Sequence, residues 1–216
     1  MAKPVKVLAV SDKVLDRLYT PDVAQKYPDV ELLIGCGDLP FYYLDFLISS
    51  FNVPLYYVRG NHDDGKQYTS DGRVLTEVPG GIDLHKKTAV HSNFLLAGLE
   101  GSMRYHPNRP HMYTDGEMQG HIARLMPRLL KNKLKYGRYL DVLITHSPPL
   151  GIHDLTDLPH TGFKPFLAFM RRFQPRYLLH GHIHAYHPNE PQITQFEQTT
   201  VINVYPMHLL DIDKQA

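Results

Sequence analysis

Short apolar runs alternate along the chain with segments of helical spacing. Runs rich in Val, Ile, Leu and Tyr predict buried strands at Val5–Val10, Glu31–Ile34, Leu55–Val58, Phe94–Ala97, Val142–Thr145, Tyr177–Leu179 and Val201–Val204. Apolar residues recur at helical intervals in three other segments, Phe41–Phe51, Gly116–Leu134 and Lys164–Phe173. Strands that alternate with helices indicate an α/β domain.

Three prolines sharpen these predictions. Pro127 lies inside the second helical segment, where it removes a backbone donor and clashes with the preceding turn, so we expect a kink or two helices. Pro165 falls in the first turn of the third segment, where no N–H is needed. Near the end, VINVYPMHLLDID predicts two short strands around a turn at Pro206, and with them a second sheet.

Five of the apolar runs end in polar residues that can bind a metal ion. The runs are VLAVSD, LLIGCGD, LYYVRGNH, VLITH and YLLHGHIH. Because sites in open α/β sheets form outside the carboxyl ends of the strands, we expect these chain-distant side chains to converge. The residues concerned are Asp12, Asp38, Asn61, His146, His182 and His184.

Two carboxylates, one amide oxygen and three imidazoles form a mixed oxygen and nitrogen set, which suits Mn²⁺, Fe or Zn²⁺. The single cysteine, Cys36, lies between two glycines after an apolar run and is expected to be a small buried thiol. The absence of thiolate argues against a closed structural zinc site. A carboxylate between two ions can bridge them, and two ions about 3.5 to 4 Å apart suit displacement at phosphorus.

The order of these residues resembles a known family. Asp12, GD at 37–38, GNHD at 60–63, His146 and GHxH at 181–184 are similar to the motifs of the calcineurin-like metallophosphoesterases, over nearly the whole chain. GNHD followed by a distant GHxH is a specific signal, whereas GD alone is weak. The resemblance implies a two-sheet β-sandwich flanked by helices, in four αββα layers, with a dinuclear metal centre.

The resemblance also assigns roles to the six residues and their neighbours. One ion would be held by Asp12, Asp38 and His184, and the other by Asp38, Asn61, His146 and His182, with Asp38 as the bridge. His62 would face the substrate, beside Asn61, and stabilise phosphoryl charge or protonate the leaving oxygen. Asp63 would orient His62.

One position departs from the family pattern. Members usually begin with DxH, but Asp12 is followed by Lys13 and Val14, and valine cannot bind a metal. Three ligands with water is a normal count for catalytic zinc, so the loss does not by itself imply inactivity. We hypothesise that the Asn61 ion binds tightly and the Asp12 ion weakly. Either Asp16 or Lys13 would be placed to compensate; Asp16 lies four residues after Asp12, and on an entering helix the two aspartates would share a face.

Two long loops, Glu100–Asp115 and Pro148–Gly162, are rich in Pro, Gly, His and Asp, and long loops in compact domains are often functional. In the first loop, Arg104 is a candidate for phosphate contact, because a guanidinium binds phosphate through two hydrogen bonds. In the second, THSPPLGIHD followed by GF looks like the cyclic-nucleotide phosphodiesterase-like part of the family. The remaining histidines are expected to be structural or surface residues: His91, His106, His111, His121, His153, His160, His187 and His208.

Composition places the chain among globular proteins. With 216 residues, 43% apolar and 21% charged, it suits a single domain over residues 1–216. The net charge of +1 gives no global field toward a membrane or nucleic acid, and we expect no membrane partner. Nucleic acid is not excluded, because every charged residue between Glu117 and Asp141 is basic; a solvated helix face is the simpler interpretation. The first residues do not read as a signal peptide, so we expect a cytoplasmic protein.

The sequence therefore predicts metal-dependent hydrolysis of a small phosphoester, either a monoester or a diester such as a nucleotide. The alternative is a scaffold of the same fold that binds protein through a degenerate metal site, which Val14 motivates. GCGD lacks the third glycine of a dinucleotide-binding fingerprint, and the chain has no GxSxG or Walker-type string.

Overall fold

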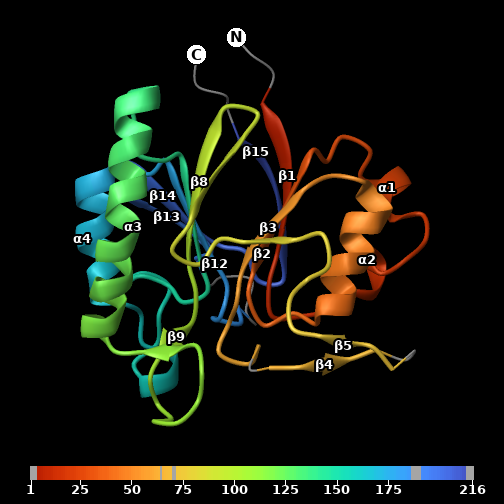
Figure 1. Cartoon of the computed structure of the whole chain (residues 1–216), viewed down its shortest axis with the longest axis horizontal. Coiled ribbons are helices and arrows are strands. Elements are labelled where there is room, and N and C mark those ends of the chain that lie inside the picture. The colour runs from red at the N-terminus through yellow and green to blue at the C-terminus, as the bar shows by residue number, and fades with distance from the viewer. Residues whose placement is uncertain (1–3, 64, 70–71, 186–190, 213–216) are drawn as a thin grey trace.

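The computed structural model describes residues 4–63, 65–69, 72–185 and 191–212. Two β-sheets pack face to face, with α3 and α4 on the outer face of one and α1 and α2 on the outer face of the other (Figure 1). This is the four-layer αββα arrangement that the family resemblance implies. The helices are α1 (Val23–Lys26), α2 (Phe41–Phe51), α3 (Asp115–Tyr136) and α4 (Lys164–Phe173), with 3-10 helices η1 (Asp16–Leu18) and η2 (Leu158–His160).

The first sheet has the strand order β15-β1-β2-β3-β6. Its strands are β1 (Val5–Val10), β2 (Leu32–Cys36), β3 (Leu55–Val58), β6 (Ile82–Asp83) and β15 (Met207–Ile212). Four strands run parallel, whereas β15 pairs antiparallel with β1 along its whole length. The parallel strands all end at the same edge, which places the residues after β1, β2 and β3 together.

The second sheet has the order β13-β14-β12-β11-β8-β7. Its strands are β7 (Thr88–His91), β8 (Phe94–Leu99), β11 (Val142–Thr145), β12 (Tyr177–His180), β13 (Ile193–Phe196) and β14 (Thr199–Asn203). The four central strands are parallel, and the two edge strands are antiparallel to their neighbours. Two small sheets lie beside these, formed by β4 (Gln67–Tyr68) with β5 (Val74–Leu75) and by β9 (Ser102–Met103) with β10 (Met112–Tyr113).

Each sheet buries both faces, which explains the continuous apolar runs in its strands. Side chains alternate across a strand, so Leu32 and Ile34 of β2 join the cluster between the sheets, whereas Leu33 joins the cluster against α2. A third cluster lies between the second sheet and helices α3 and α4, and it includes Leu143 of β11 and Phe169 of α4.

Local capping fixes the ends of α3. Thr114 Oγ1 accepts a hydrogen bond from Glu117 N at 3.3 Å, and the Glu117 carboxylate accepts one from Thr114 N at 2.8 Å, which together form a capping box. The helix ends at Gly137, whose φ of 75° is readily adopted by glycine. Pro127 lies within this single helix, so a division into two helices is wrong.

The structure confirms the seven predicted strands and the second sheet. The two strands around Pro206 also exist, but β14 belongs to the second sheet and β15 to the first. Strands of two residues, such as β4, β9 and β10, were not predicted, because so short a segment has no readable periodicity. The assignment of residues 1–216 to one domain stays a prediction.

Close packing between the sheets can be tested by a substitution at Gly98 of β8. A Cβ atom there would lie 2.7 Å from Leu84 Cβ and 2.8 Å from Val58 Cγ1, so Gly98→Ala should lower the free energy of unfolding by about 1 to 3 kcal/mol. The matched control is Gly120→Ala in α3, where an added Cβ meets nothing within 4 Å; it should stabilise the protein by up to about 1 kcal/mol. Thermal and denaturant unfolding measure both, and equal stability of the two variants would contradict the packing argument.

Candidate metal centre

The six predicted ligands follow strand ends in both sheets. Asp12, Asp38 and Asn61 come after β1, β2 and β3 of the first sheet. His146 comes directly after β11 of the second sheet, and His182 comes two residues after β12. The site therefore lies where the parallel strand ends of the two sheets meet, and neither sheet alone supplies it.

His146 stands at the centre of the site and is fully buried. Its Nε2 atom lies 3.0 Å from Asn61 Oδ1 and 3.3 Å from Asp38 Oδ2. Its Nδ1 atom lies 2.7 Å from Cys36 O, to which it donates a hydrogen bond. A metal-binding histidine commonly uses its second nitrogen in this way, and the bond holds Nε2 toward the two oxygens.

Asp38 and Asp63 join the loops that follow β2 and β3. Asp38 Oδ1 accepts a hydrogen bond from His62 N at 2.8 Å. The buried Asp63 Oδ2 accepts from Asp38 N at 2.9 Å and from Gly60 N at 2.8 Å. These three bonds fix the backbone on both sides of the site, while the His62 side chain is exposed.

Asp12 and His184 form the other half of the site. Asp12 Oδ2 accepts a hydrogen bond from His182 N at 2.9 Å, and Asp12 Oδ1 lies 3.7 Å from His184 Nε2. The Asp12 side chain is only 3% exposed, but that of His184 is 39% exposed. His184 stacks on Tyr205, with ring centroids 4.4 Å apart.

His182 connects the centre to the loop Pro148–Gly162. Its Nε2 lies 2.8 Å from Pro159 O, and its ring centroid is 4.8 Å from that of His146. The ring of His160, in the same loop, lies 5.2 Å from His182. Because a carbonyl can only accept, Nε2 carries the hydrogen and Nδ1 keeps its lone pair for a ligand.

Opposite charges dominate the electrostatics. Burial opposes ionisation of both Asp38 and His146, but their mutual attraction outweighs it, lowering the pKa of Asp38 to about 2 and raising that of His146 to about 10. Burial and the charge of His146 lower the pKa of His182 to about 4. Burial and the charge of Asp38 raise the pKa of Asp63 to about 6.

These observations fit a cation. In the described part of the chain, Asp38, His146 and His182 are the one group of three Asp, Glu, His or Cys residues whose ligand atoms all lie within 4.8 Å of one another. The attraction of a proton to His146, beside Asp38 Oδ2 and Asn61 Oδ1, marks a position that favours positive charge. Neutral imidazole, carboxylate and amide oxygen are ordinary ligands of divalent transition metals.

The backbone is shaped for close approach at these positions. Asp12, Asp38 and His182 have φ values of 61°, 54° and 67°, in the left-handed region that non-glycine residues seldom adopt. Such conformations concentrate at functional sites because the surrounding structure must hold them. A Cβ at Gly37 would lie 2.5 Å from the His146 ring, and one at Gly181 would lie 2.5 Å from Asp12 Oδ2, so both positions require glycine.

The segment after Asp12 offers no replacement for the missing histidine. Val14 is partly buried and packs against the hydrophobic cluster on the α2 side of the first sheet. Asp16 is exposed at the start of η1, and residues 13 to 15 are not helical. The expectation that Asp12 and Asp16 share a helical face is therefore wrong.

The loop Glu100–Asp115 meets the site through a residue that the sequence analysis did not select. Tyr105 accepts a hydrogen bond from Asn61 Nδ2 at 3.1 Å through its hydroxyl oxygen. Arg104 instead donates to Met112 O at 3.2 Å and to Glu117 Oε1 at 2.7 Å. A tyrosine in a histidine- and arginine-rich loop was visible in the sequence, but its reach to Asn61 was not.

Other histidines have structural contacts. His153 lies 2.9 Å from the fully buried His180 and 2.8 Å from Thr194 Oγ1. His111 lies 3.0 Å from the buried carboxylate of Glu100, which also accepts a bond from Tyr113 at 2.6 Å and anchors the loop. His187 lies outside the described residues.

Comparisons with known proteins give limited likenesses. A UPF0046 protein of Caenorhabditis elegans is 43% identical over 47 residues, which cover 22% of this chain and only 16% of that relative's own length. The structure of TT1561 of Thermus thermophilus aligns with a TM-score of 0.59 at 12% identity, over 97% of this chain and 100% of that one, and supports the fold alone. The sulfate thiohydrolase SoxB of Thermus thermophilus aligns at 12% identity over 94% of this chain and 52% of that one, with a TM-score of 0.44.

The family assignment rests on a longer match. The model of the calcineurin-like phosphoesterases matches residues 13–186, which span the GD, GNHD and GHxH motifs and four of the five strand ends that carry the site. The fold and the motif order agree with it. The chain belongs to the calcineurin-like phosphoesterase family.

Proposed function

We propose that this protein hydrolyses a small phosphoester at a centre that holds two divalent metal ions. The observation that carries the proposal is the position of His146 Nε2, from the second sheet, within 3.0 Å of Asn61 Oδ1 and 3.3 Å of Asp38 Oδ2, which follow strands of the first sheet. Asp38, Asn61, His146 and His182 would hold one ion, and Asp12, Asp38 and His184 the other. When bound, such ions polarise phosphoryl oxygens and lower the pKa of water.

His62 would act on the substrate rather than on a metal. The backbone N–H of His62 donates a hydrogen bond to Asp38, while the imidazole is exposed. The ring can therefore contact a phosphoryl group while the backbone hydrogen bond stays in place. A protonated imidazole within reach of the leaving oxygen can donate a proton to it. Asp63 would position His62 indirectly, because its hydrogen bonds go to the backbones of Asp38 and Gly60.

Tyr105 would set the orientation of the Asn61 amide. Because Asn61 Nδ2 donates to the Tyr105 hydroxyl, the amide oxygen is turned toward His146 and the metal position. The phenolic hydrogen is not used in this bond and remains a donor at the rim of the site. Arg104 is a weaker candidate than Tyr105 for contact with the substrate, because its guanidinium already donates to Glu117 and to Met112 O.

The competing proposal is a scaffold that binds protein and does not turn over substrate. It is favoured by the packing of Val14 into the hydrophobic cluster, which leaves the Asp12 side of the site without its usual histidine. Against it stands the cluster of candidate ligands around His146, of which Asn61, His146 and His182 are buried. Absence of turnover across a broad phosphoester panel with saturating Mn²⁺ would favour the scaffold.

Hydrolysis of bis-p-nitrophenyl phosphate and p-nitrophenyl phosphate with added Mn²⁺ tests the proposed site. His62→Ala should lower kcat at least about 100-fold through loss of proton transfer, and adding Asp38→Ala should remove the remaining activity. The matched control is His106→Ala, an exposed histidine of the adjoining loop that should keep wild-type kcat. A double variant as active as the wild type would place the reaction elsewhere.

Metal analysis after gel filtration tests the unequal occupancy of the two positions. The wild type should retain about one ion per chain, because the Asp12 side has only three protein ligands including the bridge. His184→Ala should retain the same amount, whereas His182→Gln should lose it. Two tightly held ions in the wild type would refute the idea.

Tyr105→Phe tests the proposed orientation of Asn61. Loss of one neutral hydrogen bond, about 1 kcal/mol, should weaken Mn²⁺ binding about fivefold in a titration followed by electron paramagnetic resonance. Tyr113→Phe is the control, since it removes a hydroxyl of the same loop that bonds Glu100 at 2.6 Å. Equal weakening in both variants would point to a general effect on the loop and not to Asn61.

A further inference from the structure

The solvent-facing side of α3 carries an apolar stripe. Ala123, Pro127, Leu130 and Leu134 follow one another at intervals of four, three and four residues, which places them on one face of the helix. All four are exposed, Leu130 to 46% and Leu134 to 89%. Because Leu130 and Leu134 lie one helical turn apart, they form a contiguous exposed apolar pair rather than two scattered side chains.

A basic stripe runs parallel to the apolar one. Arg124, Arg128, Lys131 and Lys135 lie one position further along, with the same intervals, and all are exposed. No acidic side chain interrupts residues 118–140 or 164–176, which together hold ten of the 23 Lys and Arg residues. The rest of the chain carries 13 basic and 22 acidic residues, so the small net charge conceals a strong separation of charge.

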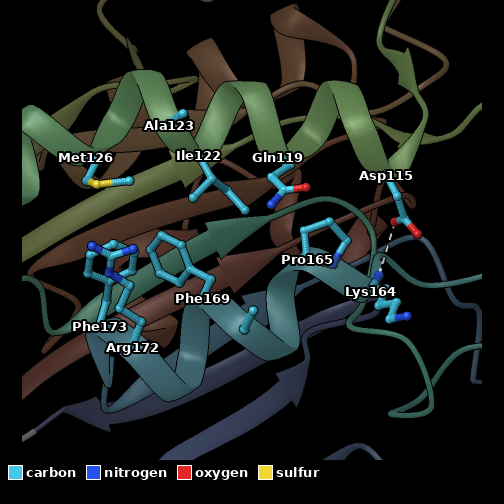
Figure 2. Close-up of a pocket in the computed structure, with 11 residues that line it drawn as sticks. Asp115, Gln119, Ile122, Ala123, Met126, Lys164, Pro165, Phe169, Arg172 and Phe173 are labelled. Carbon is cyan, nitrogen blue, oxygen red and sulfur yellow. Dashed lines mark hydrogen bonds between the residues drawn. The ribbon is translucent and has the colours of Figure 1, made fainter.

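The inner side of α3 packs against the second sheet and α4. Figure 2 shows Ile122 and Met126 pointing from α3 toward Phe169 of α4 across a groove of about 470 Å³. Arg172 of α4 also lines this groove and adds positive charge beside the stripes. The stripes therefore lie outside the packed face of the helix, with Ala123 at the border of the groove.

The charge and the apolar area of this face distinguish among its possible binding partners. A second copy of α3 would bring like charges together. A protein helix would need an apolar contact far larger than two leucines, because standard interfaces bury about 800 Å² on each partner. Single-stranded nucleic acid is bound through aromatic platforms, which the stripe lacks. An anionic lipid surface needs only a few inserted apolar side chains and several nearby bases.

We infer that the outer face of α3 docks on an anionic membrane surface, with Leu130 and Leu134 entering the interface and the basic stripe contacting lipid headgroups. Docking of this kind needs no spanning segment, and within the described ranges no helix has the length and hydropathy to cross a bilayer. The inference revises the expectation of no membrane partner, because the small net charge averages over a strongly basic face. It does not depend on the proposed hydrolysis, because none of these residues belongs to the metal centre.

Sedimentation with vesicles tests the inference on the full chain. Phosphatidylcholine vesicles containing about 30% phosphatidylserine should bind the protein, pure phosphatidylcholine should not, and salt raised from about 0.1 M to about 0.5 M should release it. Leu130→Ala with Leu134→Ala should weaken binding about tenfold, since alanine preserves the helix while removing inserted methylene groups. Arg128→Glu with Lys131→Glu should weaken it at least about 25-fold, at about fivefold per base lost.

Matched controls separate this face from exposed residues in general. Ile193→Ala, at 57% exposure, and Arg17→Glu on η1 should bind vesicles as the wild type does. All variants should keep wild-type activity toward a soluble phosphoester. Equal binding to both vesicle types, or binding unaffected by the leucine pair, would overturn the inference. So would tighter binding to duplex DNA or polyglutamate that the same variants abolish, since the face would then serve another polyanion.

Discussion

The hydrogen bond from His146 to the Cys36 carbonyl joins the two sheets at the edge where their parallel strands end. His146 belongs to the second sheet and Cys36 to the first, and their contact at 2.7 Å requires that the sandwich be closed at this edge. The same contact turns Nε2 toward Asp38 and Asn61. The candidate site is thus a product of the sheet-to-sheet packing, and any change that alters the spacing of the sheets alters the ligand positions.

The sequence indicated the fold and proposed most of the candidate site for a physical reason. Parallel strands buried on both faces read as apolar runs, and a run must end where the chain meets polar surroundings, so Asp12, Asp38 and His146 could be located by position alone. The resemblance to the family motifs added the expectation that the residues from both parts of the chain form one dinuclear centre. Contacts made by loops were different: nothing in the sequence shows that the Tyr105 hydroxyl meets Asn61, or that Pro159 O meets His182, because loop paths depend on packing between distant segments.

For two residues, Val14 and Leu134, the structure adds information on burial that the sequence pattern does not contain. Val14 was identified as a missing ligand, but only the structure shows that its side chain contributes to the hydrophobic cluster beside α2. The charged residues of α3 suggested a solvated face, yet the exposure of Leu134 could not be inferred from spacing, because the same leucine would suit a buried position. In both cases the role of the residue depends on its solvent exposure, which a local sequence pattern does not determine.

The antiparallel pairing of β15 with β1 links nearly the whole length of the chain. Val5 lies opposite Ile212 in this pairing, so β1 receives its second neighbour only when β15 has left the ribosome. Until then β1 is the edge of its sheet, with unpaired N–H and C=O groups that can attract other chains. Aggregation during translation, and assistance by chaperones that shield nascent strands, would therefore concentrate on this strand.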